Sequence, residues 1–275
     1  MKPKPVASTP IVFPVVGPVS YIDDFGDPRG GHPHEGNDLM APKRSPAVAA
    51  EDGTIKFWTT SAAAGCMLYL YGASGTTYLY IHLNNDLTKR NDNRGKCVAG
   101  VSYWTGIKDG QKVKAGQPIG YVGDSGDANG IASHLHFEVH PHDGAATDPY
   151  PYLQAAKRLF FIAAPKSTVT LSLSGSVASV AEGQLKVQVE TLRVLPGSTV
   201  MTKVGRPLVL TVPSDALVQK VLPSGIVGGT VALADAKKGQ PLTVLTLPVA
   251  TTLDVEAGAD GILSAAQIVL GTSGR

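Results

Sequence analysis

The sequence contains no histidine after His142, and its C-terminal part, Thr168–Arg275, also lacks cysteine and tryptophan. Histidine is the commonest metal ligand and exchanges protons near neutral pH. All seven histidines lie between His32 and His142. This distribution excludes a histidine-based site from the C-terminal part and indicates a single site in the N-terminal part.

Long apolar runs and basic clusters are absent as well. No apolar stretch reaches the roughly 18 residues that a membrane-spanning helix needs, so we expect no membrane span. The formal net charge is only +2, and no basic cluster is longer than a pair such as Lys89-Arg90. A nucleic-acid-binding protein would usually carry a larger cluster, so we expect no nucleic-acid partner.

Charged residues are sparse, whereas glycine and proline are plentiful. The 275 residues include 17% charged residues, 31 glycines and 20 prolines. This composition favours β-structure with many turns, and the length suits two domains better than one core. The sequence therefore predicts an all-β protein of two domains.

Cysteine is also scarce, since Cys66 and Cys97 are the only two. Alone, they are equally consistent with two free thiols. In an exported protein a disulfide would be expected. It would close a loop of about 30 residues and stabilise the fold by about 3–4 kcal/mol in the chain-entropy model.

Candidate strands follow Val48, each rich in Val, Ile, Tyr or Phe and bounded by turn-forming residues. They are Gly53–Trp58, Met67–Tyr71, Thr77–His82, Pro118–Val122 and Leu135–His140. In the last strand apolar and polar residues alternate. We therefore expect His134 and His136 to project from the same face of the sheet, with the apolar residues on the other face.

The remaining segments suggest boundaries. Residues 1–20 are rich in proline and are expected to be irregular. Leu83–Gly110 is expected to be a long loop, and Tyr152–Ala163 has the helical spacing of apolar residues. We expect a first domain over residues 1–153, a helix and linker over 154–167, and a second domain over 168–275.

The histidine motifs suit a catalytic zinc ion, which takes three protein ligands and keeps one position for water. His34 and Asp38 are separated by three residues and could supply two ligands, and the pair His134 and His136 could supply the third. Zinc would lower the pKa of bound water to about 7. His82 and the remaining strand histidine could orient that water and stabilise an oxyanion.

These motifs, taken in order, resemble the lysostaphin-like (LytM-type) zinc metallopeptidases, which cleave peptide bonds in bacterial peptidoglycan. The matching segments are His34-Glu-Gly-Asn-Asp38, Tyr80-Ile-His82, Val113-Lys-Ala-Gly-Gln-Pro-Ile-Gly120, His134-Leu-His136-Phe-Glu138 and Asp148-Pro-Tyr-Pro-Tyr-Leu153. The resemblance implies an antiparallel-sheet peptidase domain. It implies that His34, Asp38 and His136 bind Zn²⁺, with His82 and His134 as the catalytic pair. The long segment after His82 departs from the family pattern and could wall the cleft.

The resemblance also implies a function. We expect a zinc endopeptidase that hydrolyses peptide bonds in peptidoglycan stem peptides or cross-links. A non-catalytic or self-inhibited peptidoglycan-binding activator of another hydrolase is the alternative. Because the substrate lies outside the cytoplasm, we expect a secreted, periplasmic or wall-associated protein whose signal peptide is absent from this sequence.

Other features carry weaker expectations. His32, His140 and His142 are expected to be solvated loop residues near the cleft, and Glu138 to be structural rather than a base. Tyr103 and Trp104 are aromatic anchors of either the core or the groove. The C-terminal part resembles a small closed β-barrel of OB type, a fold that binds many ligands. It could target the wall, dock a protein partner or act as a spacer.

Overall fold

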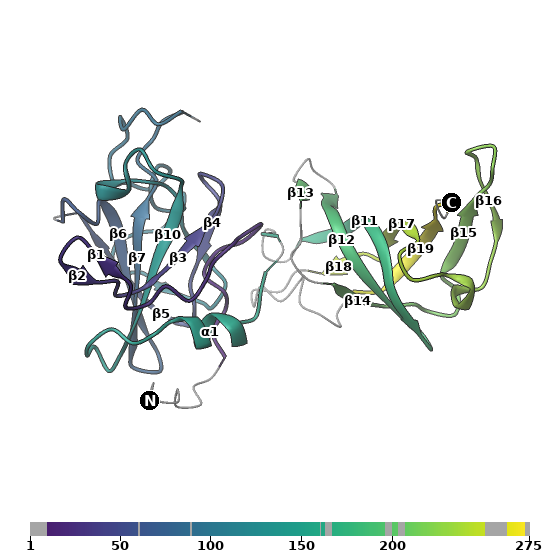
Figure 1. Cartoon of the computed structure of the whole chain (residues 1–275), viewed down its shortest axis with the longest axis horizontal. Coiled ribbons are helices and arrows are strands. Elements are labelled where there is room, and N and C mark those ends of the chain that lie inside the picture. Colours follow the sequence, from purple (N-terminus) through teal and green to yellow (C-terminus); the bar gives the residue numbers. More distant parts are fainter. Residues whose placement is uncertain are drawn as a thin grey trace. The chain divides into compact units, whose positions relative to one another are not determined.

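The computed structural model describes residues 10–59, 61–88, 90–159, 161–162, 167–195, 200–202, 207–250 and 263–272 (Figure 1). The chain forms two compact units, the first of which ends at Leu159. Most of the regular structure is β-strand, and most strand pairings are antiparallel, which confirms the all-β class. The expected boundaries at residues 153 and 168 remain a prediction, since part of 154–167 lies outside the described residues.

The first unit is built on a six-stranded antiparallel sheet with the order β3-β10-β7-β6-β5-β8. Its strands are β3 (Asn37–Met40), β5 (Gly53–Trp58), β6 (Cys66–Gly72), β7 (Thr76–Leu83), β8 (Lys112–Val113) and β10 (His134–Pro141). Strand β10 lies between β3 and β7, so its backbone pairs with both neighbours (Figure 1). This position makes β10 the strand around which the site is assembled.

Smaller elements surround this sheet. Two short antiparallel pairs join β1 (Pro28–Arg29) to β2 (His32–Pro33) and β4 (Pro46–Val48) to β9 (Pro118–Tyr121). A 3₁₀ turn, η1, spans Gly126–Ala128. The five strands expected in this unit are confirmed, with ends that agree to within one residue.

One face of the six-stranded sheet forms the core of the first unit. In β10, Leu135, Phe137 and Val139 are fully buried and pack with the apolar residues of β6 and β7. Burying each large apolar side chain contributes about 1.5–3 kcal/mol. The alternation therefore fixes the register of β10 and directs His134 and His136 to the opposite face.

The helix is shorter than expected and begins earlier. Helix α1 spans Tyr150–Ala155 instead of residues 152–163. After the helix, the amide of Lys157 donates to the carbonyl of Ile11, and its carbonyl accepts from Phe13. These backbone groups find partners in the N-terminal segment, so the helix does not need to continue. The expected residues 160 and 163 lie outside the described part of the chain.

The second unit contains a nine-stranded sheet. The main path is β13-β12-β11-β17-β19-β15-β16, and β14 pairs with β12 and β18 with β11. The strands are β11 (Thr168–Ala181), β12 (Gln184–Leu195), β13 (Val200–Thr202), β14 (Leu208–Thr211), β15 (Leu217–Val221), β16 (Val227–Thr230), β17 (Pro241–Thr246), β18 (Val249–Ala250) and β19 (Ala265–Leu270), with a 3₁₀ turn η2 (Leu233–Asp235) before β17. Among the described residues no pairing joins β13 to β16, so the expected closed OB-type barrel is not found there.

No helix in the described part of the chain is both long and apolar enough to cross a membrane.

Candidate active site

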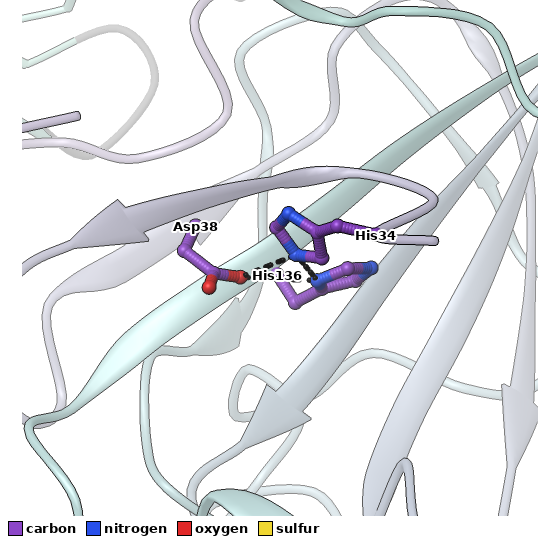
Figure 2. Close-up of side chains that lie close together, drawn as sticks. All are labelled: His34, Asp38 and His136. Carbon is purple, nitrogen blue, oxygen red and sulfur yellow. Dashed lines mark hydrogen bonds and ion pairs between the residues drawn. The ribbon is translucent and has the colours of Figure 1, made fainter. Parts of the chain in front are cut away.

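Three of the expected site residues meet at the junction of β3 and β10. His136 lies directly opposite Asp38 across these strands, and His34 precedes β3. His34 Nε2, Asp38 Oδ1 and His136 Nδ1 form a triangle with sides of 3.1, 2.9 and 3.0 Å (Figure 2). Segments that are 98 residues apart in sequence therefore converge on one point.

This triangle fits a zinc ion. Tetrahedral zinc with bonds of about 2.0–2.1 Å places its ligand atoms about 3.3 Å apart. Two imidazoles and one carboxylate are also a donor set that zinc accepts. Both histidine side chains are buried, whereas the Asp38 side chain is 19% exposed. The residues present can therefore hold zinc through three protein ligands.

Each of these three residues has an outer hydrogen-bond partner. The Nδ1–H of His34 donates to the carbonyl of Asp24 at 2.9 Å, which leaves Nε2 free for a ligand. The Nε2–H of His136 donates to Glu138 Oε1 at 3.0 Å, which leaves Nδ1 free. Arg29 Nη2 donates to Asp38 Oδ2 at 2.9 Å. Such outer partners fix the tautomer and orientation of metal ligands.

His140 extends this arrangement, although sequence reasoning placed it in a solvated loop. That expectation is wrong, because His140 lies on β10 with its side chain 18% exposed. Its Nε2 lies 2.6 Å from Glu138 Oε2, and its Nδ1–H donates to the carbonyl of Gly144 at 2.8 Å. The period-two alternation of β10 already placed His136, Glu138 and His140 on one face, and this signal could have identified His140.

His82 reaches the site through an unusual backbone conformation. Tyr78 and Tyr80 point into the core from β7, and strict alternation would send His82 there too. Its φ of +61° instead places it in the left-handed region, which ends the alternation. Such a conformation costs about 1–3 kcal/mol in a non-glycine residue. The imidazole consequently lines the same cavity as Ile81, its neighbour on β7.

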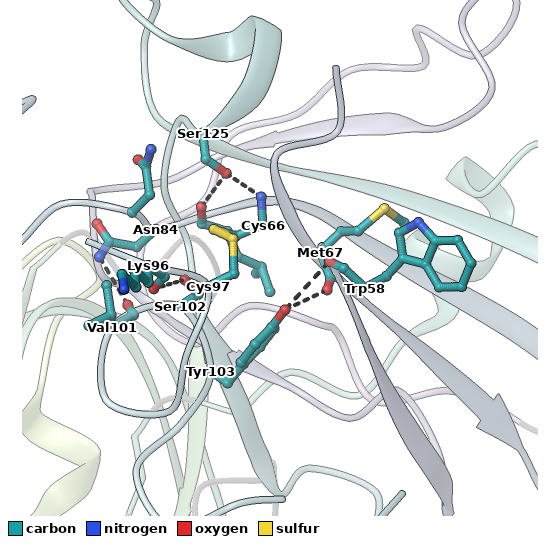
Figure 3. The surroundings of a disulfide bond; sticks show 12 residues. Trp58, Cys66, Met67, Asn84, Lys96, Cys97, Val101, Ser102, Tyr103 and Ser125 are labelled. Atoms are coloured by element: carbon teal, nitrogen blue, oxygen red, sulfur yellow. Dashed lines mark hydrogen bonds between the residues drawn. A yellow bond between two sulfur atoms is a disulfide. The ribbon is translucent and has the colours of Figure 1, made fainter. Parts of the chain in front are cut away.

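Ser125 holds His82 in place, a role that the sequence motifs did not indicate. Its carbonyl accepts the Nδ1–H of His82 at 2.8 Å. Its hydroxyl donates to the carbonyl of Leu83 at 2.6 Å and accepts from the amide of Cys66 at 2.9 Å (Figure 3). The bond to Ser125 directs the Nε2 of His82 away from the backbone.

His134 is arranged in the same way. Its Nδ1–H donates to the carbonyl of Ala132 at 2.9 Å, and its Nε2 lies 3.8 Å from Asp38 Oδ1. The rings of His82 and His134 are 5.1 Å apart and nearly perpendicular. In both residues Nδ1 is hydrogen-bonded to a backbone carbonyl, so Nε2 is the ring nitrogen that remains for the site.

The pKa shifts of the candidate zinc ligands Asp38 and His136 differ from that of the catalytic candidate His82. Burial alone would raise the pKa of Asp38, but hydrogen bonds with His136 and His34 hold it well below its usual range. Burial opposes the charged form of His136, yet its bonds to Asp38 and Glu138 raise its pKa to about 9. Burial lowers the pKa of His82 to about 4, so this imidazole is neutral at pH 7.

All five expected site residues line one cavity of about 720 Å³. Its lining contains no described residue of the long segment after Leu83, so the described part of that segment does not wall this cleft. Asn85, Lys96 and Cys97 line instead a second cavity of about 520 Å³, and Ser61 lines both.

A disulfide between Cys66 and Cys97 ties this segment to β6 (Figure 3). Tyr103 lies in the core, since it is fully buried and stacks on Phe57. Trp104 is half-buried and stacks on Tyr121. The two aromatic residues thus anchor the segment to the core.

The comparisons with known proteins agree with the motifs. Residues 98–149 match the model described as Peptidase family M23, a segment that includes His134 and His136. The chain is 29% identical over 157 residues to the L-Ala–D-Glu endopeptidase of Bacillus subtilis, covering 53% of this chain and 43% of that protein. It is 31% identical over 122 residues to the peptidoglycan DD-endopeptidase ShyA of Vibrio cholerae, covering 41% and 23%.

Among solved structures, the catalytic domain of lysostaphin from Staphylococcus simulans is 27% identical, with a TM-score of 0.37. The match covers 50% of this chain and 92% of that domain. The chain spans less than half the length of the two curated relatives above. The expected resemblance to the lysostaphin-like (LytM-type) peptidases is confirmed, and residues 98–149 match family M23.

Proposed function

We propose that this chain is a zinc-dependent endopeptidase that hydrolyses peptide bonds of bacterial peptidoglycan. The observation that carries the proposal is the triangle of His34, Asp38 and His136, with His82 and His134 beside it in one cavity. The family match supports a peptidase. The names of two relatives, which act as endopeptidases on L-Ala–D-Glu or peptidoglycan bonds, support the cell wall as the substrate.

The chain's own residues divide the chemical work. His34, Asp38 and His136 would hold zinc, which when bound supplies Lewis acidity and lowers the pKa of water to about 7. The neutral Nε2 of His82 can accept a proton from the attacking water and return it to the leaving amine. His134 can donate a hydrogen bond to the developing oxyanion once its Nε2 is protonated.

The location of the proposed substrate also implies where the protein acts. Peptidoglycan lies outside the cytoplasm, so we propose extracytoplasmic action. The Cys66–Cys97 disulfide supports this assignment, because disulfides persist mainly in oxidising compartments. For the second unit, wall binding, partner docking and a spacer role all remain proposals.

Digestion of purified sacculi tests the proposed function. We expect the full chain to release muropeptides with new amino termini, to lose this activity on treatment with a chelator and to regain it when zinc is restored. Mass spectrometry of the fragments identifies the bond that is cleaved. Binding to sacculi without any release, in zinc-loaded protein, would instead favour the non-catalytic or self-inhibited alternative.

A further inference from the structure

Arg29 occupies a distinctive position in the cleft. It lies on the short β1–β2 pair, and its side chain is 43% exposed. Its Nη2 lies 3.1 Å from Asp24 Oδ2 and 2.9 Å from Asp38 Oδ2. One guanidinium nitrogen thus anchors the side chain to two carboxylates at the edge of the candidate metal site.

The rest of the guanidinium is available. Among the described residues no hydrogen bond reaches Nε or Nη1 of Arg29, and both atoms carry N–H donors. Anchoring through Nη2 restricts the side chain before any ligand arrives. A guanidinium ordered in this way loses less entropy when it binds a further anion.

The charge of the cavity lining makes Arg29 the natural partner of an anion. It is the only Lys or Arg among the described residues that line this cavity. The lining also includes four carboxylates, namely Glu35, Asp38, Asp127 and Glu138. Away from the candidate metal site, an anionic substrate group would be repelled by Glu35 and Asp127 but attracted at Arg29.

We propose that Arg29 binds a free carboxylate of the stem peptide, which makes this enzyme selective for anionic stem peptides over amidated peptides and neutral glycine bridges. The inference rests on the proposed function for the identity of the substrate. Arg29 Nη2 lies 3.3 Å from His34 Nδ1. Arg29 is therefore next to a candidate zinc ligand, and the proposed function places the scissile bond at the zinc site. Because an extended peptide spans about 3.3–3.6 Å per residue, a carboxylate bound by Arg29 lies within about two residues of that bond.

Binding measurements separate this inference from catalysis. The probes are three synthetic forms of L-Ala-γ-D-Glu-L-Lys-D-Ala: one with all carboxylates free, one amidated at the D-Glu α-carboxyl and one amidated at the C-terminus. Calorimetry is performed on the zinc-loaded full chain carrying His82→Ala, with and without Arg29→Gln. Arg94→Gln is the matched control, because Arg94 is exposed and does not line the cavity.

We expect one of the two amidations to weaken binding about tenfold, as loss of a charge-assisted hydrogen bond predicts. Arg29→Gln should abolish that difference, whereas Arg94→Gln should preserve it. The inference is overturned if neither amidation changes affinity, or if Arg29→Gln weakens binding of all three peptides equally. Equal weakening with a lower zinc content would show that Arg29 only positions Asp38.

The two proposals fail in different ways. An Arg29-dependent preference in binding, without cleavage of sacculi by the wild-type chain, would contradict the proposed enzyme and leave the carboxylate site standing. Cleavage of free and amidated stem peptides with the same kcat/KM would contradict the inference and leave the enzyme standing.

Discussion

The two units of this chain bury very different side chains. The buried polar or charged residues of the first unit include Asp24, His34, Asn37, Asp86 and Glu138. In the described part of the second unit, Thr246 is the only buried polar side chain, and its hydroxyl accepts a hydrogen bond from the amide of Leu171. Because burying polar groups is unfavourable unless they are paired, the first unit must supply hydrogen-bond partners for its buried polar side chains, whereas the second unit buries almost only apolar ones.

Strand patterns show the same contrast. In β11 the apolar residues Val169, Leu171 and Leu173 alternate with partly exposed polar ones, as a sheet with one buried face requires. In β10 the face opposite the core also carries buried residues, because His134, His136 and Glu138 are enclosed by the cleft. A strand buried on both faces, one of them polar, therefore marks the site.

The largest effect is expected when a candidate zinc ligand is removed from the first unit. His136→Ala should abolish zinc binding, because it deletes one corner of the triangle with His34 and Asp38. Turnover should fall by more than the about 10²–10³-fold that the loss of one oxyanion-hole donor costs. Metal analysis of the purified protein, together with digestion of sacculi, measures both effects.

His142→Ala is the matched control for this variant. His142 is exposed and does not line the cavity, so its replacement should change neither zinc content nor turnover. Full zinc content in His136→Ala would contradict the assigned ligand.

His82→Ala should affect chemistry without affecting the metal. The nearest polar contacts of this imidazole are the Ser125 carbonyl and Asp127, so the three candidate ligands keep their partners. We expect normal zinc content and a barrier increase of about 3–5 kcal/mol. Single-turnover kinetics on a defined muropeptide measure the barrier, and unchanged turnover would rule out the assigned role.

The sequence predicts those parts of the site that follow from local periodicity. The alternation of Leu135, Phe137 and Val139 fixes which face His134 and His136 share, and the structure agrees. The strands of the first unit were predicted for the same reason.

Other parts depend on contacts that no local pattern encodes. The alternation of β7 points His82 into the core, and only its left-handed backbone turns it toward the cleft. Ser125 holds His82, which lies 43 residues away in the sequence. Arg29 holds Asp38, only nine residues away, but through a contact that follows from no period-two or helical spacing. The helix end depends equally on Lys157 pairing with the N-terminal segment.

Leu171→Ala tests whether the site in the first unit depends on the packing of the second unit. Leu171 is fully buried, so its truncation should lower the free energy of unfolding by about 2–5 kcal/mol. Trp58 and Trp104 are the only tryptophans and both lie in the first unit, so tryptophan fluorescence monitors that unit alone.

We expect Leu171→Ala to lower the unfolding midpoint by far-ultraviolet circular dichroism, with unchanged zinc content. Ser172→Ala, at a partly exposed position of the same strand, is the control and should have little effect. Loss of zinc from Leu171→Ala would show that the site depends on the packing of the second unit.

The smallest expected effect concerns the outer partner of His136. Glu138→Gln keeps the shape of the side chain but removes the charge that faces His136 Nε2 and His140 Nε2. Removal of an outer-shell partner weakens metal affinity about 10–100-fold, and we expect the lower end because the amide oxygen can still accept from His136. Competition with a chromogenic chelator measures the zinc affinity. His140→Ala should weaken it less, since Glu138 keeps its charge, and an equal loss in both variants would mean that His140 is needed to orient Glu138.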